Sequence, residues 1–428
     1  MPDTAQRTGA HAGADQLRLE ESNVDYPKSV PSVGLVNGKF VDENPATGMP
    51  GSLIPASWGN AVTEELVNAI QAAGIVPAEN RNDQLVLAIR QLAKLDPMQK
   101  FPVQVYRRNL IINGNFDYWQ RGTLNPATNI GGYVADRYRC DWDANAGVVI
   151  SRQSFTPGQS EVPNEPKYFL RWHQTIAGTG STQHLITQAV EGVGTLAGKK
   201  ATLSFWARSD VLRSISVSFR QTFGTGGSPS AGVGVGAGQL NITTTWQKYV
   251  VVVQLPSIAG KVLGTNGNDY LRVEWNLPLN ALQMFDLAQV QLEEGPVETP
   301  FEQRSAMQEL ALCQRYYEKT FDLNTKPGHN QGWTGGMLVS WVYAGQTNSA
   351  SQPYTQWPFK VEKRAVPSIA LYSPFGGTAG QWRSGSDTHS TANAAVLYTG
   401  TRGAIVYNSD VAAPSQAYYI HATADAEL

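Results

Sequence analysis

The chain has 428 residues, of which 41% are hydrophobic, 10% are aromatic and only 16% are charged, and its formal net charge is −2 at pH 7. This length predicts two or three domains. The 41 glycines, the 11 tryptophans and the low charge are typical of β-sandwiches and barrels rather than of helical bundles. The near-neutral net charge gives no sign of the basic surface typical of nucleic-acid binding, so no nucleic-acid partner is expected, although a local patch can still differ from the net charge.

The cysteines and the first residues bear on the compartment in which the protein is made. Cys140 and Cys313 stand far apart in the sequence and are expected to be free and buried, as in the cytosol. Residues 1–7 contain no apolar stretch, so no signal peptide is expected. No run approaches the roughly 20 apolar residues that span a membrane. We therefore expect no membrane insertion, and release by cell lysis if the protein acts outside a cell.

The first hundred residues predict an attachment region without a large core. Residues 1–55 are polar and rich in proline and glycine, which predicts an extended arm. Residues 56–100 are expected to hold two short helices, at 57–74 and at about 83–95, because apolar side chains recur there at helical spacing. Pro97 stops the second helix. Two short helices bury little area, so they are expected to pack on another chain or on copies of themselves.

Residues 101–304 alternate between apolar and polar side chains and predict a β-sandwich. Along Arg213–Arg220 and Tyr270–Asn276, every second side chain is apolar and its neighbours are polar. Val250–Val253 is apolar on both sides and is predicted to be a central strand covered on both faces. Such strands, separated by turn residues, favour a sandwich of the jelly-roll type.

A helix and a second β region are predicted after the sandwich. The helix covers 305–319 and begins with a capping box formed by Ser305 and Gln308. Four of its side chains follow the spacing of a coiled-coil seam and are predicted to line a trimer axis, namely Ala306, Leu310, Cys313 and Tyr317. Residues 305–320 would thus link the sandwich to a smaller β-sandwich at 321–428, here called the tip.

The sequence contains no strong catalytic pattern. Gly224–Gly238 includes a loose dinucleotide-binding motif, but a β segment follows where a helix is required, so a flexible loop is expected. The six histidines stand at no metal-ligand spacing, and no nucleophile-elbow motif occurs. We expect a non-enzymatic protein, although two carboxylates distant in sequence can meet in space. Glu274 is the acid considered for that role, and a solvated surface carboxylate is the favoured alternative.

Sugar binding makes a lighter demand, because an aromatic ring can stack on a sugar while a few polar groups fix its hydroxyls. Trp206 lies among polar residues on one face of its strand, which suggests such a platform unless a loop or the N-terminal helices cover it. The candidate ligand-binding residues are Trp206, Arg208, Arg272, Glu274, Trp333, Tyr354 and Trp382. Trp333, Tyr354 and Trp382 are assigned to loops, where an exposed ring suggests contact with a ligand. The alternative is a ring that is buried and anchors its loop. The tryptophans expected in the core are Trp142, Trp172 and Trp275.

Four stretches together resemble bacteriophage tail-fibre and receptor-binding proteins, namely 54–74 with 82–85, 109–122 with 135–138, 202–208 with 245–248, and 291–295 with 299–302 and 309–318. The second and third resemble the β-sandwich of a carbohydrate-binding module, and the fourth is the most specific. The resemblance implies a homotrimer whose N-terminal arm docks on the phage tail or baseplate. It also implies that the β domains bind host surface polysaccharide or lipopolysaccharide, and that the protein resides on the virion tail after assembly in the host cytoplasm.

The resemblance leaves a metal ion and two other functions open. Related sandwiches often hold a structural calcium between the first and last strands, and Asp117 and Asp286 stand near the matching positions. The resemblance implies no other cofactor. One alternative function is a structural baseplate component that uses the sandwich as a spacer. The less favoured alternative is a polysaccharide depolymerase, which needs a cleft with paired acids.

Overall fold

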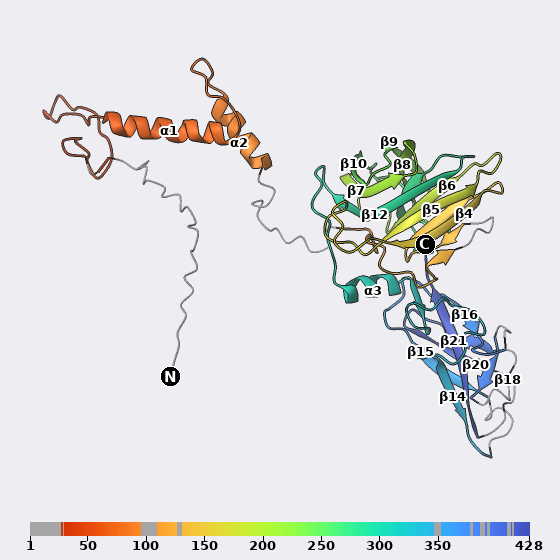
Figure 1. The fold of residues 1–428 in the computed structure, drawn as a ribbon. Helices are drawn as coiled ribbons and strands as arrows, with labels where there is room; N and C mark the ends of the chain where they lie inside the picture. Colours follow the sequence, from red (N-terminus) through yellow and green to blue (C-terminus); the bar gives the residue numbers. More distant parts are fainter. Residues whose placement is uncertain are drawn as a thin grey trace, which may run out of the picture. The chain divides into compact units, whose positions relative to one another are not determined.

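The computed structural model describes residues 27–28, 30–95, 109–125, 131–345, 352–376, 380–385, 390–391, 394–408, 412 and 415–428. The chain divides into two compact units, Met1–Val105 and Tyr106–Leu428. The described elements are mainly β-strands with three short helices, which confirms the predicted fold class (Figure 1). Among the helices that the structure describes, none is both long enough and apolar enough to cross a membrane.

The first unit contains the predicted pair of helices, α1 (Ala56–Ala72) and α2 (Gln84–Leu95). They enclose a small core whose buried members are Ile70, Ala73 and Ala88. In the described part of the predicted arm, at 27–28 and 30–55, the chain has two isolated bridges and no longer strand or helix. Residues 1–26 of the predicted arm lie outside the described residues.

In the described residues, the second unit contains two antiparallel sheets of six strands each that form the predicted sandwich. The first sheet has the order β1 (Leu124–Asn125), β4 (Gly147–Ser154), β5 (Tyr168–Ile176), β12 (Gln283–Glu294), β7 (Lys200–Ser209) and β10 (Gln247–Gln254). The second has the order β2 (Gly132–Tyr133), β3 (Tyr138–Trp142), β6 (His184–Glu191), β11 (Tyr270–Asn276), β8 (Arg213–Thr222) and β9 (Val233–Ile242).

The core between these sheets is built by the alternation that the sequence shows. Ile215, Val217 and Phe219 of β8 belong to it, while the serines between them face outward. The three tryptophans predicted for the core are buried in it, namely Trp142, Trp172 and Trp275. Period-two alternation therefore assigns the two faces of these strands correctly.

The prediction that Val250–Val253 is a central, fully covered strand is wrong. β10 is an edge strand that pairs with β7. Val251 and Val253 are buried, whereas Val250 and Val252 are 41% and 48% exposed. An apolar run on both faces therefore does not require cover on both faces, and here one side of the run borders solvent.

Of the predicted flexible loop at Gly224–Gly238, the first half does lie outside the strands. From Val233 onward the chain forms β9, the edge strand paired with β8. The pairing shifts register between Val217 and Ser218, opposite the end of the glycine run, and Gly238 there has a φ of +112°. Glycine suits this irregularity because side chains strain a backbone at positive φ.

The tip is a smaller sandwich in the same compact unit. Its first sheet is organised by β21 (Gln416–Asp425), which pairs with β13 (Tyr317–Lys319), β14 (Leu338–Val342), β16 (Ser368–Tyr372) and β17 (Trp382–Ser384), and β17 pairs in turn with β18 (Ser390–Thr391). The second sheet has the order β15 (Tyr354–Pro358), β20 (Gly403–Asn408) and β19 (Ala394–Leu397). Residues of both sheets share one core, which includes Val342, Trp382, Val406, Tyr418 and Ile420.

The linking helix α3 (Ala306–Gln314) lies between the sandwich and the tip, and it is shorter than predicted (Figure 1). Ser305 caps it by accepting a hydrogen bond from the Gln308 amide, as expected. Tyr317 belongs to β13 instead, where it pairs with Asp425. Within the unit, Cys313 and Tyr317 are buried, whereas Ala306 is exposed and Leu310 partly exposed. The four residues therefore do not form one exposed helical seam, and the trimer stays a prediction.

Both cysteines are free and buried, as predicted. Burial raises the pKa of the Cys140 and Cys313 thiols well above the ordinary value. Because the thiolate is the reactive form, we expect neither thiol to react with Ellman's reagent in the native protein. Both should react after denaturation in guanidinium chloride, which the absorbance of the released thiolate measures. Rapid reaction of the native protein would contradict this placement.

Candidate functional site

Trp206 lies on the outward face of β7 but does not form an open platform. It packs against a small apolar cluster that includes Val162, from the segment between β4 and β5, and Trp246. The neighbouring Arg208 guanidinium lies 5.0 Å from the centre of the Trp246 ring. A loop therefore covers Trp206, which is the alternative that the sequence left open.

The Asp286 carboxylate forms ion pairs with two arginines. Arg171 Nε lies 2.7 Å from Asp286 Oδ1, and Arg208 Nε lies 2.9 Å from Oδ2. Two guanidinium groups at one carboxylate repel a cation, so Asp286 does not fit the calcium site that the resemblance implies. Asp117 accepts a hydrogen bond of 3.3 Å from Asn115, and burial raises its pKa. In the described ranges, no three or more His, Cys, Asp or Glu side chains are grouped to hold a metal ion.

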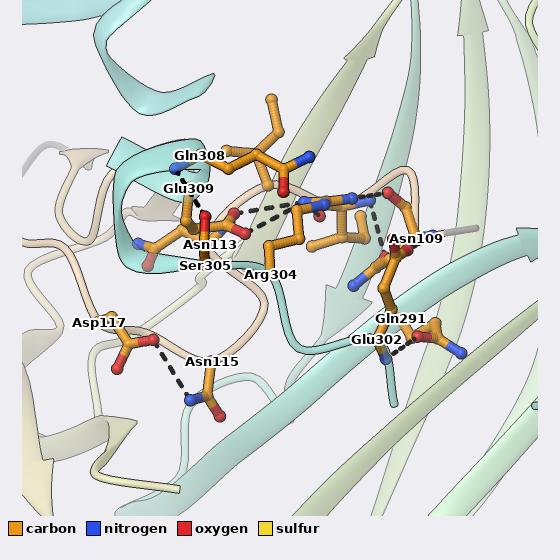
Figure 2. A network of polar contacts seen from close by, with 12 residues as sticks. Asn109, Asn113, Asn115, Asp117, Gln291, Glu302, Arg304, Ser305, Gln308 and Glu309 are labelled. Atoms are coloured by element: carbon orange, nitrogen blue, oxygen red, sulfur yellow. Dashed lines mark hydrogen bonds and ion pairs between the residues drawn. The ribbon is translucent and has the colours of Figure 1, made fainter. Parts of the chain in front are cut away.

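Residues 109–122, one stretch of the resemblance, lie next to residues 302–309, which connect two parts of the fourth stretch. Figure 2 shows Arg304 between Asn109 and Glu309, with Asn115 and Asp117 apart from this network. Arg304 Nη1 donates to the Ile111 carbonyl at 3.0 Å and to Glu309 at 3.3 Å. Glu302 accepts a hydrogen bond of 2.6 Å from the Asn109 amide. These contacts tie the start of the sandwich to α3, and their role is to hold this junction.

The prediction that Glu274 is a solvated surface carboxylate is wrong. Glu274 is 6% exposed, although it lies on the outward face of β11 as the alternation predicts. Arg272 Nε donates to its carboxylate at 2.8 Å, Ser218 Oγ donates at 2.8 Å, and Arg220 adds a weaker contact at 3.4 Å. Arg272 and Glu274 are therefore brought together as an ion pair that accounts for their polarity without a ligand.

The three aromatic candidates in the tip have different surroundings. Trp382 is fully buried in the tip core on β17, so its assignment to an exposed loop is wrong. Tyr354 is 67% exposed, but it lies on the strand β15 rather than in a loop. Trp333 is 41% exposed and does lie outside regular structure. The short strand around Trp382 was missed because glycine and serine residues surround it in the sequence.

Trp333 belongs to a larger group on the outward side of β14 and β21, here called the aromatic patch. Its members are Trp333, Val339, Trp341, Tyr343, Phe375 and Tyr419. Val339 pairs with Tyr419, so both project from the same face of the sheet, and Trp341 continues that face two residues on. The Trp333 ring lies 6.3 Å from Phe375, nearly parallel at 12°, and meets Tyr419 edge to face at 5.4 Å. Apart from Tyr419, the members have exposed fractions of 41–64%.

Hydrogen bonds hold the segment that presents Trp333. The Gly332 amide donates to the Pro374 carbonyl at 2.9 Å, which fixes the two aromatic segments side by side. Thr334 Oγ1 lies 2.8 Å from His421 Nε2, and Thr320 Oγ1 lies 2.8 Å from His421 Nδ1. His421 is buried against Phe321, and burial lowers its pKa to about 4. A neutral imidazole therefore anchors the residue that follows Trp333.

The sequence contains one signal for the members of the patch that were missed. Val339, Trp341 and Tyr343 recur at period two in a predicted strand, which indicates a single face. Large apolar side chains on one strand face normally indicate the core, so the pattern alone assigns them to the wrong side. Phe375 and Tyr419 join the patch through strand pairing and loop packing, and no local pattern reveals such neighbours.

No protein-family model and no curated protein matches the chain. Among solved structures, a family 4 carbohydrate-binding module (CBM4) is similar, with 18% identity over 43% of this chain and 98% of the module and a TM-score of 0.25. The CBM22-2 xylan-binding domain from Paenibacillus barcinonensis has 15% identity over 38% of this chain and 94% of that domain, with a TM-score of 0.26. The enzymatically active domain of tailspike protein 4 from bacteriophage CBA120 has 14% identity and a TM-score of 0.26, over 44% of this chain and 22% of that chain.

Proposed function

We propose that the protein is a non-enzymatic receptor-binding protein that recognises a cell-surface glycan through the aromatic patch of its tip. The observation that carries this proposal is the exposure of Trp333, Trp341 and Phe375 on one side of one sheet. Contiguous exposed apolar surface is rare on soluble proteins and marks sites of interaction. Aromatic rings with polar edges suit the apolar faces and hydroxyl groups of pyranose sugars.

The proposal extends to a phage tail fibre that docks on the tail or baseplate through its first unit. The sequence resemblance supports it, and so does the small core of that unit. Leu66, Val76 and Ile89 are 44%, 85% and 58% exposed in the described part of the unit, which fits packing against another protein. The homotrimer, the virion tail as the location, and host polysaccharide or lipopolysaccharide as the ligand belong to the same proposal.

Binding without cleavage is supported by the state of four acidic side chains. Asp286 and Glu274 contact arginines in the sandwich, and Asp425 and Glu427 contact arginines beside the tip. A glycoside hydrolase needs one protonated acid and a second carboxylate across an open cleft. Carboxylates held in ion pairs serve structure instead. Incubation with host polysaccharide is therefore expected to release no new reducing ends.

The test replaces rings of the aromatic patch one at a time. Trp333→Ala and Trp341→Ala are each expected to weaken binding to purified host lipopolysaccharide or capsule about tenfold, because truncated aromatic contacts cost roughly 1–2 kcal/mol. Isothermal titration calorimetry measures the affinity. Tyr354→Ala is the control, since Tyr354 is even more exposed than either tryptophan but projects from the second sheet of the tip. If both tryptophan variants bind like the unaltered protein, the patch is not the receptor site, and a structural baseplate role is favoured.

A further inference from the structure

A hollow lies on the tip, next to the sandwich, and shares no residue with the aromatic patch. This junction groove has a volume of about 500 Å³. Its floor is the outward side of two paired strands, with Ala370 of β16 opposite Thr423 of β21, and Ser368 opposite Asp425. Tyr372 is a further lining residue on β16.

One side of the junction groove is an ion pair held in a fixed position. Arg121 Nη2 lies 2.8 Å from Asp425 Oδ2, and the guanidinium stacks over the Tyr317 ring at 3.7 Å from its centre. Glu427 contacts the same guanidinium at 3.4 Å. The Asp425 side chain remains 37% exposed, so its carboxylate borders the hollow. The groove therefore presents a fixed donor group next to a fixed acceptor.

This pairing matches adjacent hydroxyl groups on a sugar. One hydroxyl can donate to the Asp425 carboxylate while its neighbour accepts from the Arg121 guanidinium. The exposed Ser368 hydroxyl, which donates to the Asp425 carbonyl at 3.3 Å, adds a further polar group on the floor. Because Asp425 and Glu427 together balance the charges of Arg121 and Arg137, the groove has no surplus positive charge that would select an anion.

We propose that the junction groove binds one neutral pyranose unit, with its ring against Ala370 and Tyr372 and adjacent hydroxyls between Arg121 and Asp425. The volume is within the range of small-ligand sites, which is about 300–1,000 Å³. The inference rests on the proposed function for the class of ligand, whereas the site itself is separate. A glycan chain that contacts both sites would be bound more tightly than by either one.

The experiment fills the groove and leaves the aromatic patch unchanged. Ala370→Trp places a ring over the floor from an exposed strand position, and Gln356→Trp is the matched control on the exposed face of β15. The probes are glucose, galactose, mannose, maltose and lactose, observed by saturation-transfer difference NMR. We expect at least one probe to bind the unaltered protein, the Gln356→Trp control and the Trp333→Ala/Trp341→Ala double variant. Ala370→Trp should lose that signal.

The outcomes separate the two sites. The proposal that the groove binds a sugar is contradicted if the signal is kept in Ala370→Trp. It is also contradicted if no probe gives a signal with the unaltered protein. If the sugar signal is lost in the Trp333→Ala/Trp341→Ala double variant but kept in Ala370→Trp, the groove is not the binding site and the aromatic patch is supported instead. Tyr372→Leu, which keeps an apolar strand residue, should weaken binding about tenfold, the size of one lost ring contact. It decides the matter if Ala370→Trp shows a lowered melting temperature.

Discussion

Lys363→Met is expected to lower the free energy of unfolding by about 3–5 kcal/mol, because it leaves the charge of Glu318 buried without its partner. The two side chains are 0% and 1% exposed and form an ion pair. Lys363 Nζ also donates to the Gln314 carbonyl at 2.6 Å, at the end of α3. Urea unfolding followed by tryptophan fluorescence measures the loss.

Two further variants show whether the buried charge causes this loss. Lys363→Met with Glu318→Gln removes both charges and should restore most of the stability, since a neutral buried pair avoids the desolvation penalty. Lys360→Met is the surface control, because Lys360 is exposed, and its backbone amide rather than its side chain contacts Glu318. A double variant as unstable as Lys363→Met alone would assign the loss to packing instead.

Arg137→Met is expected to cost a similar amount, about 3–5 kcal/mol, and to separate the unfolding of the tip from that of the sandwich. Arg137 is 1% exposed, forms an ion pair with Glu427 and stacks on the Tyr316 ring at 3.4 Å. It also donates to the Ala189 carbonyl of β6 at 2.6 Å. The Arg137 guanidinium thus joins the second sheet of the sandwich to Tyr316, which precedes β13, and to Glu427, which follows β21.

Differential scanning calorimetry measures this separation. The unaltered second unit should unfold in one transition and Arg137→Met in two, with the tip first because its core is smaller. Arg139→Met is the matched control two residues away, because the Arg139 side chain is 43% exposed in its pair with Asp141. Such surface pairs contribute about 0–1 kcal/mol. A single transition in Arg137→Met would show that other contacts suffice to join the two parts.

The sequence predicts the faces of strands better than their places in a sheet. The alternation along Arg213–Arg220 assigns Ile215, Val217 and Phe219 to the core correctly, because side-chain direction depends on the local backbone. Val250 and Val252 are exposed because β10 has a single neighbour. The number of neighbours of a strand depends on the topology of the whole chain, so no local pattern contains it.

For the candidate site residues too, the sequence predicts local features but not the neighbours that the fold brings close. Trp333 is recognised from its polar, glycine-rich surroundings, and Trp382 has the same surroundings but is buried in the core. The difference arises because Trp382 precedes residues that pair with β21, whereas Trp333 packs on the outside of that strand. Glu274 lies on the polar, outward face of its strand, but its contacts with Arg220 and Arg272 leave it buried. The contact with Arg220 depends on how the strands pair in the fold, and no local pattern in the sequence predicts it.

The central place of β21 has a consequence for engineering a binding surface on the tip. Its inward side chains Tyr418, Ile420 and Ala422 are fully buried, and among the described strands it pairs with four others. A replacement there disturbs several pairings at once. The outward positions of β14 and β16 border solvent, so their side chains can be exchanged without moving the core. A tip designed to bind a chosen ligand should therefore be built by grafting residues onto those two strands, with β21 kept as an unaltered scaffold.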